Sequence, residues 1–242
     1  MKNILPLFFL ALLSFSFATQ SQAQDADEVI AAYLEVTNGA KWSEFSAMRM
    51  TGSSVNQGME FPISVVAMRP NLQKVEVSIQ GKSFVDSYDG EVAWSINPFM
   101  GGTEPTKKNE EETAEAALNN FEPELLNWRD KGHTVTYDGA EEVEGTDCHR
   151  LKLVKANGDE EYYFFDKETA VLIMQRSYIK SGPMKGQAVE TYMSDYDEVN
   201  GIYIAFTLEQ KVGGQTFMQM TAETIELDPE DLTKEAFAFP EK

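Results

Sequence analysis

Cysteine is almost missing from this sequence of 242 residues, since Cys148 is the only one. A single cysteine excludes an intramolecular disulfide, so we expect the hydrophobic core to hold the fold unaided, with Cys148 as a small buried member of it. Basic residues are also scarce, with 20 Lys and Arg against 40 Asp and Glu and a net charge of −20. Because nucleic-acid phosphates and anionic membrane surfaces are bound by Lys and Arg, this balance argues against both as partners.

Histidine is scarce as well, which limits the catalytic and metal chemistry available. Cys148 and His149 are adjacent in an expected strand, where neighbouring side chains point to opposite faces, so they cannot form a nucleophile–base pair. A pair of Cys148 with His133 stays open. These three residues lack zinc-site spacing, and calcium-loop, phosphate-loop and Gly-x-Ser-x-Gly motifs are absent. We therefore expect no enzyme, no metal and no cofactor, and a hydrolase that uses the abundant carboxylates is the remaining catalytic alternative.

Long apolar runs are confined to the N-terminus. Lys2 precedes an apolar stretch at residues 4–17, and Ser21-Gln22-Ala23 offers small residues for cleavage before Gln24. No later stretch approaches the ~18 apolar residues of a membrane-spanning helix, so we expect no integral membrane segment. The sequence thus predicts a signal peptide at residues 1–23, followed by one exported, soluble domain at residues 24–242.

The remaining pattern predicts a mainly β protein with a few helices. A helix is expected at residues 25–38, where apolar side chains recur at helical spacing before Asn38-Gly39. A polar insert predicts two short helices, at residues 110–119 and 123–131. Because strands do not alternate with helices, we expect a curved antiparallel sheet, although periodicity alone leaves a β-sandwich or a closed barrel open. The expected strands are residues 45–55, 60–68, 73–80, 83–88, 92–97, 133–137, 149–155, 161–166, 171–178, 187–196, 203–211 and 216–227.

Residues 65–101 carry an ordered set of short motifs. Arg69-Pro70-Asn71 ends one strand, because proline cannot donate to a sheet ladder. Asp89-Gly90 supplies the positive φ of a hairpin turn, and Trp94 and Asn97-Pro98-Phe99 follow. In order and spacing this set resembles the LolA-like family of periplasmic lipoprotein carriers, also called lipoprotein-sorting proteins.

The resemblance implies a LolA-like half-barrel whose concave face is covered by a helical lid. It also implies a periplasmic carrier or chaperone that binds lipoprotein acyl chains, or a similar apolar ligand, in that face and moves it toward the outer membrane. Its partners would be an inner-membrane donor and an outer-membrane acceptor, and we expect a monomer. Envelope-stress sensors share the half-barrel, so the alternative is a non-catalytic interaction or sensor module that binds a protein partner through an acidic surface.

The resemblance also assigns candidate site residues. In the family the Arg before this Pro hydrogen-bonds lid carbonyls, so Arg69 is the expected lid latch, and a bond to a charged group contributes about 1.5–3 kcal/mol. The insert is the expected cover, assisted by Val29 and Tyr33 of the N-terminal helix. The other expected ligand-binding or lid residues are Trp94, Phe99, Phe121, Leu125, Leu126 and Trp128. Strand methionines are further cavity candidates, with core packing as the alternative: Met48, Met50, Met59, Met68, Met174, Met193, Met218 and Met220.

Overall fold

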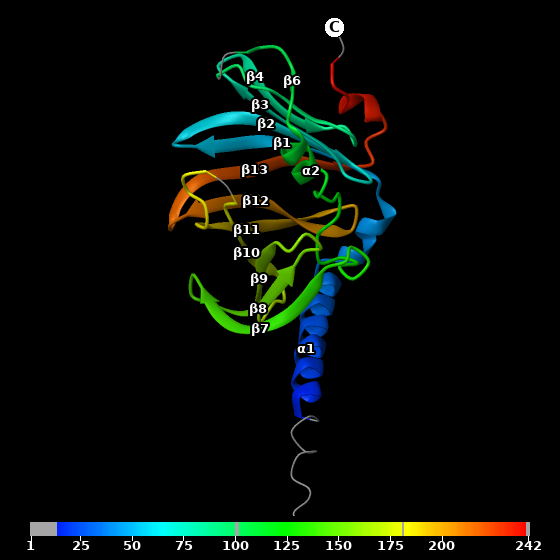
Figure 1. Cartoon of the computed structure of the whole chain (residues 1–242), viewed down its shortest axis with the longest axis vertical. Coiled ribbons are helices and arrows are strands. Elements are labelled where there is room, and N and C mark those ends of the chain that lie inside the picture. The colour runs from blue at the N-terminus through cyan, green and yellow to red at the C-terminus, as the bar shows by residue number, and fades with distance from the viewer. Residues whose placement is uncertain (1–13, 100–101, 181, 241–242) are drawn as a thin grey trace, which may run out of the picture.

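The computed structural model describes residues 14–99, 102–180 and 182–240, without the side chains of residues 14–24. Strands make up about half of these residues. Residues 1–13 of the expected signal peptide lie outside the described residues. Thirteen strands in the described ranges form one antiparallel sheet, which curves and does not close (Figure 1). The prediction of a mainly β protein with a curved antiparallel sheet is therefore confirmed.

The sheet consists of two meanders joined along one strand pair. Its strand order is β6-β5-β4-β3-β2-β1-β13-β12-β11-β10-β9-β8-β7. The pair β1–β13 joins the two meanders, with Met48 opposite Leu227 and Asn56 opposite Met218. The strands are β1 Ala47–Asn56, β2 Met59–Met68, β3 Leu72–Ile79, β4 Lys82–Tyr88, β5 Ala93–Ile96, β6 Thr106–Lys107, β7 Thr134–Val143, β8 Thr146–Val154, β9 Glu160–Asp166, β10 Leu172–Tyr178, β11 Ala188–Val199, β12 Ile202–Val212 and β13 Gln215–Leu227.

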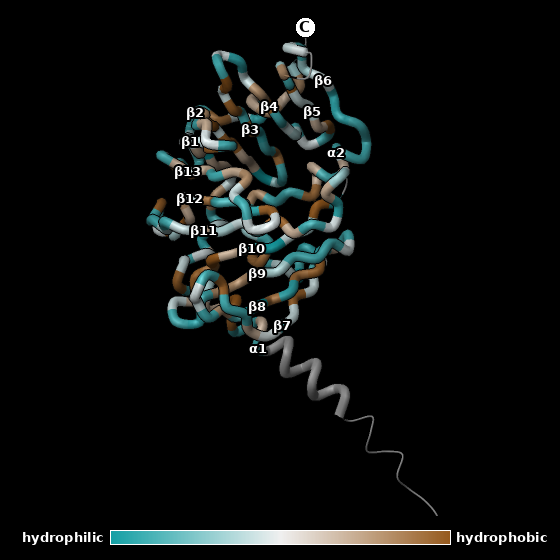
Figure 2. Tube along the Cα trace, turned by 90° about the vertical axis from the view of Figure 1, so that its left-hand side faces the viewer, coloured by the Kyte–Doolittle hydropathy of each residue, from teal (hydrophilic) through white to brown (hydrophobic). Residues whose placement is uncertain are grey.

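Turn residues end the strands where the sequence predicts. Asn200 and Gly201 connect β11 to β12 with φ of 52° and 83°, the positive values that a tight two-residue hairpin requires. Apolar and polar residues alternate along the strands, and Figure 2 shows short hydrophobic stretches interrupted by hydrophilic ones. Strand β6, of two residues, was not expected, because so short a segment carries no periodicity.

The helices differ more from expectation. α1 spans Ser14–Val36, so the helix expected at residues 25–38 is present but begins earlier, and it ends before Asn38, which has a φ of 51°. A 3-10 helix that was not expected, η1 Gly39–Glu44, follows, and another, η2 Lys234–Ala236, lies near the C-terminus. In the described residues, no helix combines the length and apolar character needed to cross a membrane.

The insert between β6 and β7, defined here as residues 108–133, contains one helix instead of two. α2 spans Glu110–Ala116, and Asn109 caps it by accepting a hydrogen bond from the Glu112 amide. The helix expected at residues 123–131 is wrong, because these residues form successive turns. Asn127 has a φ of 54°, which interrupts any helical run at its centre.

α1, η1 and the insert cover one face of the sheet, called here the inner face. Leu125 of the insert packs with Ile30 of α1 and with Leu151 of β8, while Leu126 packs with Trp42 of η1 and Ile202 of β12. The insert connects the two outermost strands, so it must pass across the sheet from one edge to the other (Figure 1). The sheet and this cover together enclose the main core.

The C-terminal segment, defined here as residues 228–240, lies on the opposite face. Its Leu232 and Phe237 pack with Ala47 of β1 and Leu72 of β3. The neighbour of Ala47 in β1, Met48, packs with the inner-face core instead. Because adjacent residues of a strand point to opposite faces, this segment is separated from the insert by the sheet.

Candidate functional site

A cavity of about 280 Å³ lies between the inner face and its cover. The sheet contributes apolar side chains from β10, β11 and β12, and the cover contributes α1, η1 and the insert. The cavity opens to solvent beside Tyr203, which is 45% exposed. Its lining residues are Tyr33, Trp42, Pro123, Glu124, Tyr163, Leu172, Gln175, Met193, Tyr196, Tyr203, Ile204, Ala205 and Leu208.

Register and one irregularity bring the sheet residues to this cavity. Met193 of β11 stands directly opposite Leu208 of β12, so both side chains reach the same face. The pairing of β9 with β10 shifts between Leu172 and Met174. Leu172 and Gln175 therefore both line the cavity, whereas Met174 packs into a separate cluster on the outer face.

Three of the four tyrosines that line the cavity, Tyr33, Tyr163 and Tyr196, have hydroxyl groups whose ionisation is suppressed by burial. The Tyr163 hydroxyl donates to a Glu161 carboxylate oxygen at 2.7 Å, and the Tyr196 hydroxyl donates to the Leu172 carbonyl oxygen at 2.7 Å. Burial raises the pKa of Tyr33 to about 12, and it also raises the pKa values of Tyr163 and Tyr196. All three hydroxyls therefore remain protonated and able to donate hydrogen bonds at neutral pH.

Ionic contacts join the cover to the sheet beside the cavity. Glu124 of the insert accepts a hydrogen bond from His133 Nε2 at 2.9 Å and lies 3.6 Å from Lys155 Nζ. The same Lys155 lies 2.7 Å from Glu161 of β9. Burial opposes ionisation of Glu124, but hydrogen bonds from His133 and Asn120 and nearby lysines outweigh it and hold its pKa below the ordinary value.

Arg69 follows β2 and reaches both the η1–β1 junction and the insert. Its Nε donates to the Phe45 carbonyl oxygen at 2.8 Å, and its Nη2 donates to the Trp42 carbonyl oxygen at 2.9 Å. Nη2 also pairs with a Glu122 carboxylate oxygen of the insert at 2.8 Å. The resemblance implied backbone carbonyls of the lid as acceptors. In this chain the bond to the insert goes to a side-chain carboxylate, and the carbonyls belong to residues 42 and 45.

The other insert residues expected at the site surround the cavity without lining it. Phe121 packs edge-on against Trp42 with ring centroids 5.6 Å apart, and Leu126 joins the same cluster. Leu125 packs toward α1, and Trp128 lies partly buried beneath Arg129, which is 4.0 Å above its ring. These insert residues hold the cover in place. Trp42 of η1, against which Phe121 packs, lines the cavity itself.

Trp94 and Phe99 lie away from this cavity. The Trp94 indole donates to the Phe237 carbonyl oxygen at 2.9 Å, so it is buried under the C-terminal segment on the outer face. Phe99 is 52% exposed in the loop after β5. The structure therefore does not bring these two residues together with Arg69 and the insert.

Several cavity residues were not singled out from the sequence. Trp42, Gln175, Tyr196 and Leu208 carry no motif, and only their positions in adjacent strands or in η1 place them together. Two residues that the sequence analysis named do line the cavity. They are Tyr33, which was assigned to the cover, and Met193, which was among the strand methionines. Strand alternation could have identified Leu208, whereas Gln175 depends on the β9–β10 register shift, Tyr196 follows an irregularity at Asp195, and Trp42 lies in η1.

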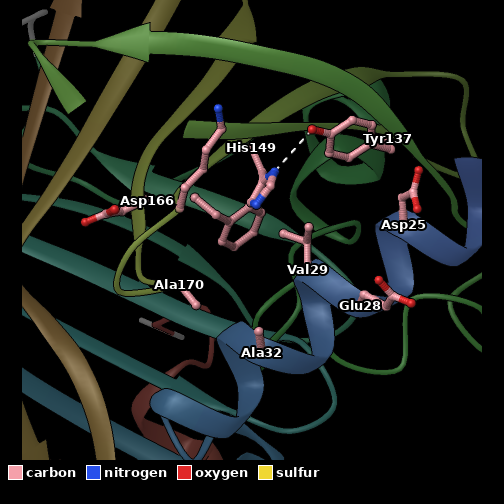
Figure 3. Close-up of a pocket in the computed structure, with 10 residues that line it drawn as sticks. Asp25, Glu28, Val29, Ala32, Tyr137, His149, Asp166 and Ala170 are labelled. Carbon is pink, nitrogen blue, oxygen red and sulfur yellow. Dashed lines mark hydrogen bonds between the residues drawn. The ribbon is translucent and has the colours of Figure 1, made fainter. Parts of the chain in front are cut away.

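A second, more polar hollow of about 420 Å³ lies where α1 meets β7 and β9 (Figure 3). His149 Nδ1 and the Tyr137 hydroxyl are 3.1 Å apart there, and Asp25 and Glu28 point toward the hollow from α1. Burial, with help from the positive charge of Lys167, lowers the pKa of His149. Its mixture of acidic and basic groups and its smaller apolar lining make it a poorer ligand site than the cavity beside Tyr33.

The candidate catalytic residues are separated. Cys148 is fully buried in an outer-face cluster with Phe164 and Met174, whereas its neighbour His149 faces the hollow on the inner face. The prediction that these two cannot form a pair is confirmed. Among the described residues, no group of three or more His, Cys, Asp or Glu side chains is arranged to hold a metal ion.

Comparison with known proteins identifies the fold. No family model matches the chain, and no curated protein matches it by sequence. An outer membrane lipoprotein-sorting protein domain from Vibrio parahaemolyticus is similar, with a TM-score of 0.58 and 11% identity over 89% of this chain and 97% of that one. A LolA superfamily protein from Nitrosomonas europaea is similar with a TM-score of 0.54 and 12% sequence identity, over 90% of this chain and 97% of that one. A DUF1329 family protein from Desulfovibrio piger is similar with a TM-score of 0.51 and 13% sequence identity, over 87% of this chain and 97% of that one. The chain therefore has the LolA-like fold.

Proposed function

We propose that the protein is a non-catalytic periplasmic carrier that binds an acyl chain of a lipoprotein, or a similar apolar ligand, and moves it toward the outer membrane. The observation that carries this proposal is the apolar cavity between the inner face and the cover. Aliphatic side chains from Leu172, Met193 and Leu208 form its floor, and Trp42 of η1 forms part of its roof. The motif set around Arg69 and the fold shared with a lipoprotein-sorting domain support the same function.

Burial of the chain supplies the binding energy. Each methylene removed from water contributes roughly 0.8 kcal/mol, so even a short acyl chain gains several kcal/mol before the costs of ordering it. A carrier must also release its load. Side chains of the cover, with Trp42 foremost, can refill the apolar space as the ligand leaves and so lower the cost of emptying it.

Arg69 is proposed as the residue that holds the cover closed. Its ion pair with Glu122 and the position of its guanidinium 5.0 Å from the centre of the Phe121 ring join the end of β2 to the insert, and its bonds to the carbonyls of residues 42 and 45 fix the guanidinium. Hydrogen bonds to charged groups contribute about 1.5–3 kcal/mol, which changes a closed-to-open ratio roughly ten- to hundredfold. Loss of Arg69 should therefore favour the open form and weaken retention of ligand.

Export completes the proposal. Residues 1–23 are proposed to be removed as a signal peptide, leaving residues 24–242 as the periplasmic carrier. An inner-membrane donor would load it and an outer-membrane acceptor would unload it. With twice as many acidic as basic residues, the protein should be guided toward basic surfaces on these partners.

The test is to purify the exported protein from a bacterial periplasm and identify the extracted lipids by mass spectrometry. Arg69→Leu is compared with the wild type, and Arg49→Leu serves as the control. Arg49 also forms ion pairs, with Glu226 and Asp231, but these lie away from the insert. We expect near-stoichiometric lipid in the wild type and in Arg49→Leu, and a reduced amount in Arg69→Leu.

An absence of lipid from all three proteins, together with no displacement of an acyl-chain fluorophore, would contradict the carrier. That result would instead favour a module that binds a protein partner through its acidic surface. Equal lipid in all three proteins would support the carrier and remove Arg69 from its proposed role.

A further inference from the structure

One rim of the sheet, formed by the ends of neighbouring hairpins, differs from the rest of the molecule in composition. The rim is defined here as residues 56–59, 79–82, 179–180, 182–187 and 211–217. We infer that it is a membrane-contact surface, through which the protein binds a phospholipid bilayer that contains anionic lipid. The inference goes beyond the proposed carrier function, and binding to a bilayer can be tested separately from binding of a ligand.

The hairpin ends of the rim lie next to one another in the sheet. Asn56, at the end of β1, stands opposite both Met59 of β2 and Met218 of β13. Because neighbouring strands lie about 4.8 Å apart, Met59 and Met218 are about 10 Å from each other across β1. Val212, at the end of β12, is opposite Val189 of β11, so the β10–β11 connection reaches the same edge. Figure 1 shows these hairpin ends on one side of the sheet, and Figure 2 views the molecule from that side.

Large apolar side chains project from this rim into solvent. Met59 is 56% exposed, Phe217 is 50% exposed and Met184 is 45% exposed. Phe217 is the extra residue of a β-bulge, because the pairing of β12 with β13 skips it, and a bulge turns its side chain away from the regular strand. Single exposed apolar residues are common on protein surfaces, but several of them on adjoining hairpin ends mark an interaction surface.

The charge of the rim is opposite to that of the whole molecule. Its residues include four lysines and no Asp or Glu, whereas the chain has twice as many acidic as basic residues. Lys180 and Lys211 pair with carboxylates of neighbouring segments. Lys82 and Lys185 are exposed, and neither forms an ion pair with any residue that the structure describes. Two cations at the rim are therefore available to a partner.

These features together fit a bilayer surface. The membrane interface takes up apolar side chains, and anionic head groups attract nearby lysines. The overall shortage of basic residues argues against an anionic membrane as a partner of most of the protein surface, and the rim is the exception. At physiological ionic strength, exposed charges more than about 8 Å away are largely screened, so the acidic remainder of the molecule does little to oppose contact at the rim.

A line of apolar side chains on the inner face connects the rim with the cavity. Leu208, which lines the cavity, stands opposite Met220 of β13. Met218 points to the same face as Met220, because strand residues alternate, and Met218 and Met59 share Asn56 as their neighbour across β1. Under the proposed carrier function, an acyl chain can therefore pass between the bilayer and the cavity along these side chains.

The experiment measures binding of the exported protein to vesicles by flotation. Vesicles of phosphatidylcholine with about one quarter phosphatidylglycerol are compared with vesicles of phosphatidylcholine alone. Met59→Ser combined with Phe217→Ser removes two apolar side chains from the rim. The matched control is Val36→Ser combined with Leu118→Ser, because these residues lie outside the rim and are 44% and 45% exposed.

A second pair of variants tests the charge. Lys82→Gln combined with Lys185→Gln removes the two unpaired cations of the rim. Lys167→Gln combined with Lys234→Gln changes the net charge equally, and these exposed lysines also form no ion pair within the described ranges. Any difference between the two double variants therefore reports the position of the lysines and not the net charge.

We expect the wild type to float with the anionic vesicles and to bind phosphatidylcholine alone at least fivefold more weakly. Met59→Ser with Phe217→Ser should weaken binding at least tenfold, because two apolar side chains no longer enter the bilayer. Lys82→Gln with Lys185→Gln should weaken binding to the anionic vesicles about five- to twenty-five-fold, since each lysine near an anionic surface contributes roughly a factor of five. Both control variants should bind as the wild type does.

A labelling measurement locates the contact independently of affinity. An environment-sensitive fluorophore attached at Met59→Cys or Phe217→Cys should brighten and shift to shorter wavelength with anionic vesicles. The same label at Leu118→Cys should not respond. Cys148 is fully buried, so the native protein takes up the label at the introduced cysteine.

Several results would overturn the inference. No flotation with either kind of vesicle would reject the membrane contact, and a dimer that is lost in Met59→Ser with Phe217→Ser would then assign the rim to a second copy of the chain. Equal losses in the rim and control variants, or no loss in any of them, would place vesicle binding elsewhere on the surface. None of these results decides the carrier function, which is judged by the lipid extracted from the periplasmic protein.

Discussion

At the scale of single residues, the cover is held by neighbouring side chains that point in different directions. Leu125 enters the cluster with α1, and the next residue, Leu126, enters the cluster with Trp42. A regular helix would place consecutive residues about 100° apart, and the positive φ of Asn127 ends any such run. The insert is therefore fastened on two sides by two adjacent leucines.

This arrangement makes Leu125 important for stability. Leu125→Ala should lower the free energy of unfolding by about 2–5 kcal/mol, because a buried leucine is replaced by a partly unfilled space. Chemical denaturation monitored by circular dichroism measures the change. The control is Leu118→Ala in the same insert, where the side chain is 45% exposed and the change should stay within about 0.5 kcal/mol. Equal effects of the two substitutions would show that the insert does not pack as described.

Cys148 gives a second prediction at this scale. Burial, followed by the negative charge of Asp166, raises the pKa of its thiol to about 11. At pH 8 on the order of one thiol in a thousand is then ionised, and the residue is fully buried. Iodoacetamide should modify the native protein far more slowly than the urea-unfolded protein, as mass spectrometry can follow. Fast modification of the native protein would mean that the outer-face cluster opens readily.

At the scale of elements, carboxylates of the insert attach it to basic side chains of the neighbouring segments. Glu122 pairs with Arg69, and Glu124 pairs with His133 and Lys155. The folded-state pKa of Glu124 lies below its ordinary value of 4.5. Its contribution to stability is therefore fully present above pH 4.5 and is lost as the pH falls through the lower folded-state value.

The insert should accordingly loosen in acid before the sheet unfolds. The protection factors of the insert amides, each taken against the intrinsic exchange rate at the same pH, are expected to fall as the pH drops below 4.5, while those of the β8 and β9 amides stay high. Glu124→Gln should weaken this dependence, because it removes the titrating group. Glu111→Gln, on the exposed side of α2, should leave it unchanged. Parallel loosening of the insert and the central strands would show that they unfold as one unit.

Elements that depend on local backbone preferences could be predicted from the sequence, whereas those that depend on contacts between distant residues could not. The hairpin at Asn200-Gly201 depends on local backbone preference, and the sequence predicts it correctly. The helical pattern at residues 123–131 is overridden by burial of Leu125 and Leu126 in separate clusters. The cavity was less predictable than the strands, because Gln175 reaches it only through a register shift between β9 and β10.

At the scale of the whole molecule, the sheet is covered on both faces, and the C-terminal segment supports the half that α1 does not reach. Phe237 is fully buried, and its carbonyl oxygen accepts hydrogen bonds from Trp94 Nε1 and Ser87 Oγ. Trp94 was expected near the ligand, and the structure uses it to fix the end of the chain to β5.

Removal of that anchor should affect the entire protein. Phe237→Ala is expected to lower the free energy of unfolding by about 3–5 kcal/mol, a typical cost for a buried phenylalanine. Phe217→Ala, where the ring is 50% exposed, should change it by less than about 0.5 kcal/mol. Thermal and urea unfolding of both variants provide the comparison. A small effect of Phe237→Ala would show that the C-terminal segment is dispensable for the sheet.

The junction between β1 and β13 has a consequence for synthesis. Arg49 and Glu226 face each other across this junction although they are 177 residues apart in the chain. As the chain emerges with its N-terminus first, β1 can pair with β2 at once, but its other edge stays bare until the last strand appears. An unpaired edge can join another copy of the chain, and such distant pairings form slowly. A nascent or truncated chain that ends before Gln215 therefore exposes β1 to aggregation, and only a chain that includes β13 closes that edge.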